Sequence, residues 1–288
     1  MRGDKAKNST IFIFGLLVIL NSLAWITVYN LSKPRLLEVD FFDVGQGDSI
    51  FIETPQKYQV LIDGGPSSKI IEKLGKVMPF YDRSLDLVIL THPDPDHLVG
   101  LIDVLKNYNV NLIGFTGVVS SNPEFIEWKS QISSKHTPLI VLTKNEKILL
   151  GKEVYMYILA PLESFEGREV KDFNSSSIVA RLVFKNSSFL FTGDTPKSVE
   201  KELVENKSNI DSDVLKVGHH GSKTSTSDIF LQAVTPENAV IQVGKDNRYG
   251  HPHQEVLDRL QNYGIKILRT DQDSDIKIIS DGENFKIK

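Results

Sequence analysis

Histidines and aspartates with the spacing of metal ligands crowd one short segment of the chain. Four potential ligands occupy six consecutive positions, and these are His92, Asp94, Asp96 and His97. Pro93 and Pro95 exclude a helix across this turn and hold the residues before them extended. Because alternate side chains of an extended backbone point the same way, His92 and Asp94 are expected to project to one side.

Two other side chains of the same segment can face a second metal position nearby. Asp96 and His97 open a predicted helix over residues 98–107, and their side chains can face a position a few ångströms from the first. Two neighbouring points with mixed imidazole and carboxylate ligands predict a two-metal site, whose ions typically lie roughly 3.5 to 4 Å apart. A solvated acidic turn is the alternative for this segment, since Asp and Pro are ordinary turn residues.

A further carboxylate follows a predicted strand later in the chain. Asp194 ends the sequence Thr-Gly-Asp after the strand predicted at 188–191, and a predicted helix over residues 197–205 comes next. This arrangement repeats that of the first motif, so Asp194 is a candidate bridging ligand. A helix N-cap is the alternative role, because Asp is favoured ahead of a helix.

Two adjacent histidines end another predicted strand. His219 and His220 follow the apolar sequence Val-Leu-Lys-Val-Gly and precede Gly-Ser-Lys. Adjacent histidines in this position favour ligand or catalytic roles, since histidine is the commonest metal ligand and a frequent general acid. Ser222 and Lys223 are candidate phosphate contacts beside them, and a solvated loop is the alternative for both.

Polar residues also end the first predicted strands, at 36–43, 49–53 and 58–62. They are Asp43, Gln46, Asp48 and Asp63. Sites in layered folds are usually built at such strand ends. For Asp48 and Asp63, a turn carboxylate that accepts backbone N–H groups is an equal alternative.

The order of predicted elements gives the architecture. Strands, a helix and more strands are followed by a second run of strands and helices that ends with strands at 265–269 and 275–279, which are expected to close the sheet. Two mixed sheets packed face to face with helices outside would satisfy this order. Residues 120–136 read as a variable loop, in which Phe125 and Trp128 are expected to pack locally and His136 to lie at the surface.

The amino-acid composition limits the class of protein, the way nucleic acid could be bound and the available metal ligands. The chain has 288 residues, of which 40% are hydrophobic and 24% charged, as in an ordinary globular protein. A net charge of -4 gives no sequence-wide basic surface, so any nucleic acid must be bound by a local patch. The absence of Cys leaves His, Asp, Glu and Asn as metal ligands, a set compatible with zinc or manganese.

The sequence of the N-terminal region predicts a membrane segment. Residues 1–10 are short and basic, and residues 11–29 carry no charge, so a transmembrane helix is expected over residues 11–31 ahead of a domain at 35–288. The basic residues favour a cytoplasmic N-terminus and an exported domain, although Lys33 and Arg35 beyond the segment weaken this preference. A signal peptide that is cleaved to release a secreted protein is the alternative.

Taken together, the motifs resemble the metallo-β-lactamase superfamily, and within it the domain attached to ComEC competence proteins. The resemblance covers roughly residues 36–275 and implies an αββα sandwich of class α+β. The general superfamily has histidine at the position of Asp94 and near Asn174, and this sequence departs from it as ComEC-like domains do. The motifs that carry the resemblance occur in the order Asp43-Val-Gly-Gln-Gly-Asp-Ser49, Asp63-Gly-Gly65, His92-x-Asp-x-Asp-His97, Thr192-Gly-Asp194, Leu215-Lys-Val-Gly-His-His-Gly-Ser222 and Tyr249-Gly-His-Pro252.

The resemblance implies a role for each motif residue. His92 and Asp94 would help to bind one metal ion, Asp96 and His97 the other, and Asp194 would bridge them. His219 is expected to be the remaining ligand, and the alternatives are His220, which would otherwise protonate the leaving group, and His251. The residues expected to act in catalysis are Asp96, Asp194 and His220, and those expected to contact substrate are Asn174, Ser222, Lys223 and His251.

Three hypotheses follow for function. The first is a membrane-anchored phosphodiesterase or DNA nuclease linked to DNA uptake, in which two Zn or Mn ions generate a bridging hydroxide. Its partners would be the cell membrane, single-stranded DNA and other competence or envelope proteins. The second is a hydrolase of a small or cell-surface phosphoester, lactone or amide, and the third is a receptor that binds DNA or a partner without turnover.

Overall fold

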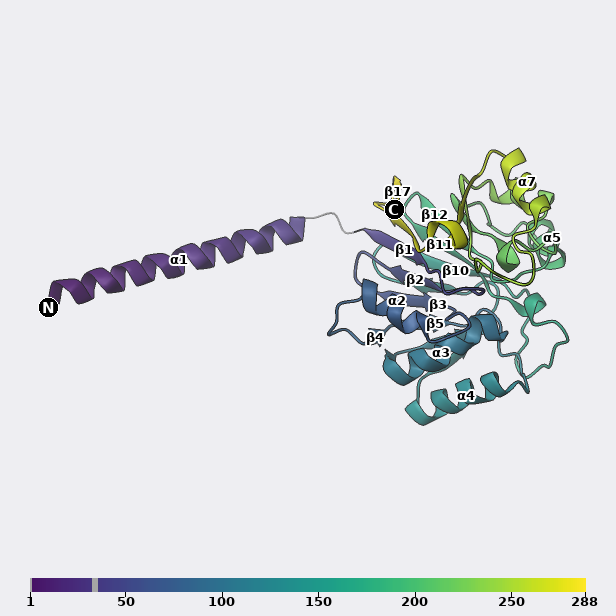
Figure 1. Ribbon diagram of the computed structural model, residues 1–288, viewed down its shortest axis with the longest axis horizontal. Coiled ribbons are helices and arrows are strands. Elements are labelled where there is room, and N and C mark those ends of the chain that lie inside the picture. The colour runs from purple at the N-terminus through teal and green to yellow at the C-terminus, as the bar shows by residue number, and fades with distance from the viewer. Residues whose placement is uncertain (1, 33–35) are drawn as a thin grey trace. The chain divides into compact units, whose positions relative to one another are not determined.

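The computed structural model describes residues 2–32 and 36–288, and the chain divides into two compact units between residues 35 and 36. The first unit is the helix α1 (Arg2–Ser32), which therefore includes the basic residues ahead of the apolar segment (Figure 1). Its segment Ile11–Tyr29 has 19 residues with exposed side chains and a mean hydropathy of 2.4, long and apolar enough to cross a membrane. The structure does not describe Lys33 or Arg35, so the predicted start of the domain at Arg35 lies outside the described residues.

The second unit contains two large sheets, each with parallel and antiparallel strands. The first sheet has the order β17 (Phe285–Ile287), β16 (Ile276–Ser280), β1 (Leu37–Phe41), β2 (Ile50–Glu53), β3 (Gln59–Ile62), β5 (Leu87–Ile89), β7 (Ile113–Phe115) and β8 (Leu139–Val141). The second has the order β15 (Lys266–Arg269), β14 (Asn238–Ile241), β13 (Val214–Lys216), β12 (Ser187–Phe191), β11 (Val179–Phe184), β10 (Val154–Ala160) and β9 (Lys147–Leu149). A small parallel pair joins β4 (Ser84–Leu85) to β6 (Asn109–Val110).

Helices cover the outer faces of both sheets. The helices beside the first sheet are α2 (Lys69–Val77), α3 (Pro95–Asn107) and α4 (Pro123–Lys135) (Figure 1). Those beside the second are α5 (Lys197–Glu205), α6 (Asp228–Val234) and α7 (Gln254–Asn262). Short elements complete the unit, namely α8 (Thr270–Asp273) and the 3₁₀ turns η1 (Phe173–Ser176) and η2 (Gly218–Gly221).

Three apolar layers hold this sandwich together. The central layer lies between the sheets and includes Phe41 of β1 and Phe191 of β12, whose ring centroids are 6.2 Å apart. A second layer joins the first sheet to α2–α4, and a third joins the second sheet to α5–α7. Alternate residues of each strand enter the central layer, as burial of both faces of a sheet requires. The predicted αββα fold is confirmed, and all three layers are built from residues after 36, so this unit is expected to fold without α1.

Two sequence predictions of local structure are wrong. The segment 120–136 contains the helix α4 in place of a loop, because Pro123 occupies its first turn and Phe125, Trp128 and Ile132 form one buried face. Phe125 and Trp128 do pack locally, and His136 is exposed, as predicted.

The last two predicted strands do not close one sheet. β15 is the edge strand of the second sheet, whereas β16 pairs with β1 in the first. The register joins Leu37 to Ser280 and Phe41 to Ile276, and it puts Ile276 and Ile278 into the central layer. Sequence periodicity does not distinguish which of two facing sheets an apolar strand joins.

The strand directions put the polar strand ends at one edge. β3 and β5 are parallel neighbours, so Asp63 and His92, which follow them, lie close together. β12 and β13 are parallel neighbours in the second sheet, and Asp194 and His219 follow these strands. The edge where the four strands end therefore collects the chemically active side chains.

Candidate metal centre

The turn after β3 fixes the start of α3. The backbone N–H of Gly64 donates to the His97 carbonyl oxygen at 2.7 Å, and that of Gly100 donates to the Gly65 carbonyl at 2.9 Å. A side chain at Gly100 would meet the Gly64 oxygen at 1.9 Å, so only glycine permits this approach. The close contact anchors the helix that carries Asp96 and His97.

Four histidines converge on Asp194, and each directs the same ring nitrogen toward it. Each uses Nδ1 for a hydrogen bond that leaves Nε2 facing the carboxylate. The Nδ1 partners are Thr91 Oγ1 for His92 at 3.1 Å, Asp63 Oδ2 for His97 at 2.8 Å, Thr224 Oγ1 for His219 at 3.1 Å and the Gln242 carbonyl for His220 at 2.9 Å. A metal-binding histidine usually has its second nitrogen held in this way.

The hydrogen-bond partners of Nδ1 determine which ring nitrogen of each histidine carries the proton. The Gln242 carbonyl and the Asp63 carboxylate can only accept, so Nδ1 of His220 and of His97 donates. The Thr91 hydroxyl donates to Asp63 Oδ2 at 2.7 Å, and its oxygen is left to accept from His92. In their neutral form, which is the form that binds a cation, these rings would therefore present the lone pair of Nε2 to the centre.

Asp194 lies between two groups of side chains. On one side, its Oδ1 is 3.4 Å from His97 Nε2, and its Oδ2 is 3.5 Å from His220 Nε2. Asp96 completes this group, with Oδ2 at 3.2 Å from His220 Nε2. One ligand atom from each of Asp96, His97, Asp194 and His220 lies within 4.8 Å of the others, close enough to surround one ion.

The second group contacts Oδ2 of Asp194, the oxygen that His220 of the first group also contacts. This oxygen is 4.0 Å from His92 Nε2 and 3.8 Å from His219 Nε2. Asp94 Oδ2 lies 3.4 Å from His92 Nε2. The two groups meet at Asp194, so this carboxylate can bridge them.

Burial and charge shift the pKa values of this cluster. Burial opposes charge on His220, but Asp194 and Asp48 outweigh burial and raise the pKa of His220 to about 10. The pKa of His97 is likewise raised, because Asp194 and Asp63 outweigh its burial. Burial would raise the pKa of Asp194, and the neighbouring His220 and His97 lower it well below its usual value. The carboxylate is therefore ionised at neutral pH and available to a cation.

A buried lysine lies behind the centre, and the sequence analysis did not identify it. Lys216 has a fully buried side chain, and its Nζ forms an ion pair with Asp48 Oδ2 and donates to the Gly193 carbonyl at 3.0 Å. Asp48 Oδ1 lies 3.3 Å from His220 Nδ1. Lysine is rarely buried without a partner, so its place in an apolar strand beside candidate ligands was the signal available.

The loop that presents the paired histidines is strained. His219 and His220 have φ values of 49° and 53°, in the left-handed region that disfavours residues other than glycine. Such strain costs of order 1–3 kcal/mol per residue and clusters at functional sites. Tertiary contacts such as the Gln242 carbonyl hold His220 in this conformation.

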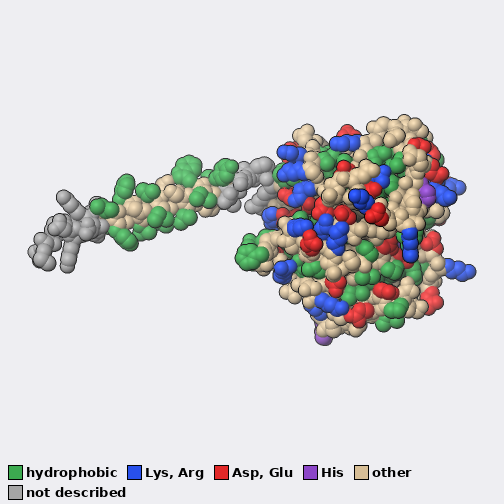
Figure 2. Space-filling model, viewed as in Figure 1, with side chains coloured by type: hydrophobic (Ala, Val, Ile, Leu, Met, Phe, Trp, Pro, Cys, Tyr) green, Lys and Arg blue, Asp and Glu red, His purple; other side chains and the backbone are tan. Residues whose placement is uncertain are grey.

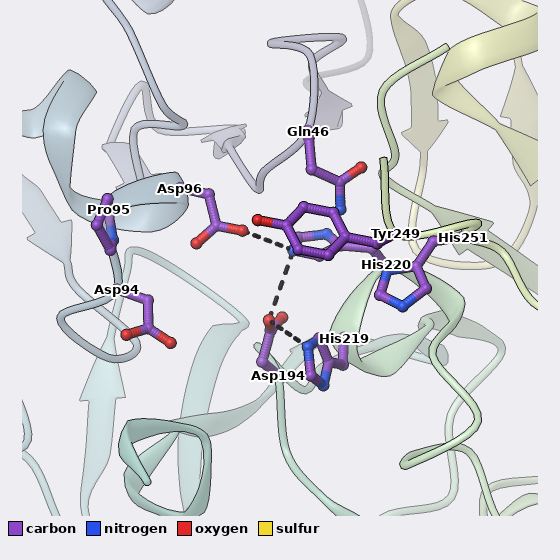
Figure 3. Close-up of a pocket in the computed structure, with 9 residues that line it drawn as sticks. All are labelled: Gln46, Asp94, Pro95, Asp96, Asp194, His219, His220, Tyr249 and His251. Carbon is purple, nitrogen blue, oxygen red and sulfur yellow. Dashed lines mark hydrogen bonds and ion pairs between the residues drawn. The ribbon is translucent and has the colours of Figure 1, made fainter. Parts of the chain in front are cut away.

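The centre opens into a pocket of about 270 Å³. Figure 3 shows Asp94 and Asp96 on one side of the cavity, and His219, His220 and His251 on the other. The full lining comprises Gln46, Asp94, Pro95, Asp96, Asp194, His219, His220, Tyr249 and His251. All of these residues except Pro95 carry a polar or ionisable group, and three of them are the carboxylates Asp94, Asp96 and Asp194.

The donor set suits divalent cations. Nε2 of His92, Nε2 of His97 and Oδ1 of Asp194 are buried and have no hydrogen-bond partner. Buried polar atoms are normally satisfied, so a convergent unsatisfied set calls for a ligand. Imidazole and carboxylate groups without thiolate suit ions such as zinc and manganese.

Residues 42–245 match the family described as the metallo-beta-lactamase superfamily. This match covers most of the globular unit and includes every residue of the two groups around Asp194. The chain belongs to the metallo-β-lactamase superfamily.

Within this superfamily, the chain is similar in sequence to competence proteins. The chain is 38% identical over 257 residues to ComE operon protein 3 of Bacillus subtilis, covering 83% of this chain and 32% of the relative. It is 34% identical over 234 residues to competence protein ComA of Neisseria gonorrhoeae, covering 81% of this chain and 31% of that protein. The predicted resemblance to ComEC-type competence proteins is confirmed, and the chain spans about a third of the length of these relatives.

Two solved structures share the fold of this chain. YhfI from Bacillus subtilis has a TM-score of 0.55 at 11% identity, covering 84% of this chain and 99% of that chain. Igni18 from Ignicoccus hospitalis, described as a metallo hydrolase, has a TM-score of 0.53 at 13% identity, covering 84% of this chain and 98% of that chain. The metallo-β-lactamase fold generally belongs to metal-dependent hydrolases and typically binds two divalent ions, in agreement with the two groups of side chains that meet at Asp194.

Some predicted substrate contacts lie away from the pocket. Among the described residues, the cavity lining includes His251 but not Ser222, Lys223 or Asn174. Ser222 is buried, and its Oγ accepts a hydrogen bond from Thr224 Oγ1 at 3.0 Å, while Lys223 is exposed. Asn174 lies beside the centre, with Nδ2 3.5 Å from His219 Nδ1.

The polar residues at the first strand ends have different positions. Gln46 lines the pocket, and its Oε1 accepts from the Gly244 N–H at 3.1 Å. Asp63 both accepts the Thr91 N–H at 2.8 Å and holds His97, so its two predicted alternatives are combined. Asp43 lies outside the centre and pairs with Lys69 at 3.1 Å.

Proposed function

We propose that this protein is a membrane-anchored, two-metal phosphodiesterase that cleaves DNA. The observation that carries the proposal is the convergence of four histidine Nε2 atoms on Asp194, which lines an open pocket together with two of these histidines. Two divalent ions, when bound, would lower the pKa of a water molecule and neutralise charge on a phosphoryl oxygen. Phosphodiesters have the charge and geometry that this chemistry serves.

We assign the ligands from the two groups around Asp194. His92, Asp94 and His219 would hold one ion, whereas Asp96, His97 and His220 would hold the other. This assignment keeps the predicted pairs of the first motif and makes His220, an alternative in the sequence analysis, a ligand beside His219. The Gln242 carbonyl supports it, because it keeps the Nδ1 proton on His220 and leaves Nε2 to bind.

Other residues would orient substrate and protons. His251 lines the cavity, and its ring centroid is 5.7 Å from that of His219. Burial and the nearby His220 and His219 lower the pKa of His251 to about 4, so it would be neutral and able to accept or donate one hydrogen bond. Asp96 and Asp194 would position the attacking water, and Asn174 would orient His219 from outside the pocket.

The membrane is the second part of the proposal. Ile11–Tyr29 would anchor the chain, with residues 1–10 in the cytoplasm and residues 35–288 outside the cell membrane. Figure 2 shows basic and acidic side chains interspersed over one face of the globular unit, so DNA would be bound through local contacts. The competence proteins among the relatives support a role in DNA uptake, with single-stranded DNA and other competence or envelope proteins as partners.

The test compares substrates and metals side by side. The purified chain is supplied with Zn²⁺ or with Mn²⁺, and hydrolysis of single-stranded DNA, bis-p-nitrophenyl phosphate and nitrocefin is measured. Turnover of both phosphodiesters, abolished in His97→Ala, is expected, because His97 belongs to the proposed ligand set. Lys69→Ala, which alters an ion pair outside the centre, is the control and should retain activity.

The other outcomes identify the alternatives. Cleavage of nitrocefin alone would replace the nuclease with an amide or lactone hydrolase. DNA binding that survives His97→Ala, without turnover with either metal, would indicate a receptor. Either result would refute the proposal.

A further inference from the structure

An exposed tyrosine stands at the mouth of the pocket. Tyr249 lines the cavity and keeps 53% of its surface accessible, so a ligand in the cavity can reach its ring. In Figure 3 its ring projects across the cavity, in front of His220. We propose that Tyr249 is a stacking platform for an unpaired nucleobase next to the scissile phosphodiester, an inference that rests on the proposed function.

Hydrogen bonds centred on Asn247 hold this tyrosine in place. Asn247 Oδ1 accepts the Tyr249 N–H at 3.2 Å and the His251 N–H at 3.0 Å. Its Nδ2 donates to the Gly244 carbonyl at 2.9 Å and to the His251 carbonyl at 2.7 Å. One side chain therefore fixes the loop from both sides, so the backbone that carries Tyr249 has little conformational freedom to lose on binding.

The neighbours of the ring fit a nucleotide. His251 stacks against Tyr249 with ring centroids 5.8 Å apart and an interplanar angle of 23°. The guanidinium carbon of Arg248 lies 5.2 Å from the ring centroid, and its Nη2 donates to the Tyr249 hydroxyl at 3.2 Å. Arg248 and Lys245 are exposed on the same loop, and they can meet backbone phosphates while the ring meets a base.

The geometry favours an unpaired base. The faces of bases within a duplex are covered by their neighbours, whereas a single strand can turn one face toward an aromatic ring. Stacking of this kind depends little on sequence, since every base has a π face. Tyr249 would therefore give the site a preference for single strands without selecting particular bases.

The first experiment measures KM with two oligonucleotides. The full chain in detergent, loaded with the more active of Zn²⁺ and Mn²⁺, cleaves a single-stranded oligonucleotide and the same strand with abasic sites. Tyr249→Ala should raise KM for the first by about 5- to 150-fold, the effect of losing one stacking partner. It should leave KM for the abasic strand and kcat for both strands nearly unchanged.

The second experiment observes stacking directly. A phosphorothioate strand carrying 2-aminopurine is titrated with the loaded chain, and its fluorescence should be quenched on binding. Tyr249→Phe and Tyr249→Trp should retain the quenching, because both keep an aromatic face, whereas Tyr249→Ala should lose it. Tyr81→Ala is the matched control, since Tyr81 is 77% exposed but is not among the residues that line the pocket.

The outcomes test the stacking platform and the proposed nuclease function separately. If Tyr249→Ala raised KM equally for the normal and the abasic strand, the platform would be refuted. It would also be refuted if Tyr249→Phe lost as much quenching as Tyr249→Ala. Unquenched 2-aminopurine in the bound wild-type complex would overturn it as well. If the wild type cleaves no phosphodiester yet quenches the probe through Tyr249, the proposed nuclease fails and the platform stands.

Discussion

Replacement of Lys216 by methionine tests the buried charge pair behind the candidate centre. The Lys216 side chain is fully buried, and its Nζ contacts Asp48 Oδ2, donates to Gly193 and lies 3.8 Å from Asp194 Oδ1. Methionine keeps most of the apolar stem and removes the ammonium group. The substitution therefore leaves two buried carboxylates without their cation.

The expected loss in the free energy of unfolding is about 3–5 kcal/mol, the usual cost of breaking a buried ion pair. The remaining contact between Asp48 and His220 at 3.3 Å favours the lower end of this range. The double variant Asp48→Asn with Lys216→Met removes both charges, so most of the loss should be recovered, to within about 1 kcal/mol of wild type. Comparison of the two variants separates charge from packing.

Urea unfolding of residues 36–288 at neutral pH measures these values. EDTA is present throughout, because a bound metal would add its own binding free energy to the stability. Lys69→Met is the control, since Lys69 pairs with Asp43 at 3.1 Å and its side chain is 38% exposed. This exposed pair should contribute no more than about 1 kcal/mol.

Two results would refute the reasoning. A loss for Lys216→Met as small as that for Lys69→Met would mean that the Lys216 ammonium reaches water in solution. A double variant that is less stable than Lys216→Met would mean that the two side chains act through packing and not through charge.

Two further predictions concern Asp63 and Asp40. Asp63→Asn should weaken metal binding about 10- to 100-fold, because Asp63 accepts the His97 Nδ1 proton at 2.8 Å, and unchanged affinity in a chelator competition would contradict this role. Burial raises the pKa of Asp40 to about 6 despite the nearby Lys277, so the folded state holds this proton more tightly than the unfolded chain and loses stability as pH rises from about 4 to 6. Asp40→Asn should therefore match wild type near pH 4 and exceed it by about 3 kcal/mol at pH 8 in urea unfolding, and a difference that does not grow with pH would contradict the prediction.

The local motifs were readable from sequence because their geometry is set by near neighbours. Pro93 and Pro95 shape the turn that separates His92 from Asp96, and α3 begins at Pro95, three residues before the predicted start. The apolar strands and the order of elements also predicted the two-sheet sandwich, since patterning largely determines fold class. The segment Ile11–Tyr29 was recognisable by its length and lack of charge alone.

Some errors came from local signals that were overlooked. The buried face of α4, made by Phe125, Trp128 and Ile132, has helical spacing in the sequence. The loop predicted there was therefore avoidable. The assignment of β15 and β16 to different sheets was not, because an apolar strand fits either face of the central layer.

The sequence by itself determined which residue types were available and where strands would deliver them. Only the tertiary structure decided which atoms meet. His219 and His220 are neighbours in sequence, yet His220 faces Asp96, 124 positions away, because the carbonyl of Gln242, which directly follows β14, holds its other nitrogen. Lys216 likewise gained its position from contacts with Asp48 and Gly193, which are distant in the sequence. Hydrogen bonds and burial between distant segments depend on the packed sheets, so no pattern of near neighbours encodes them.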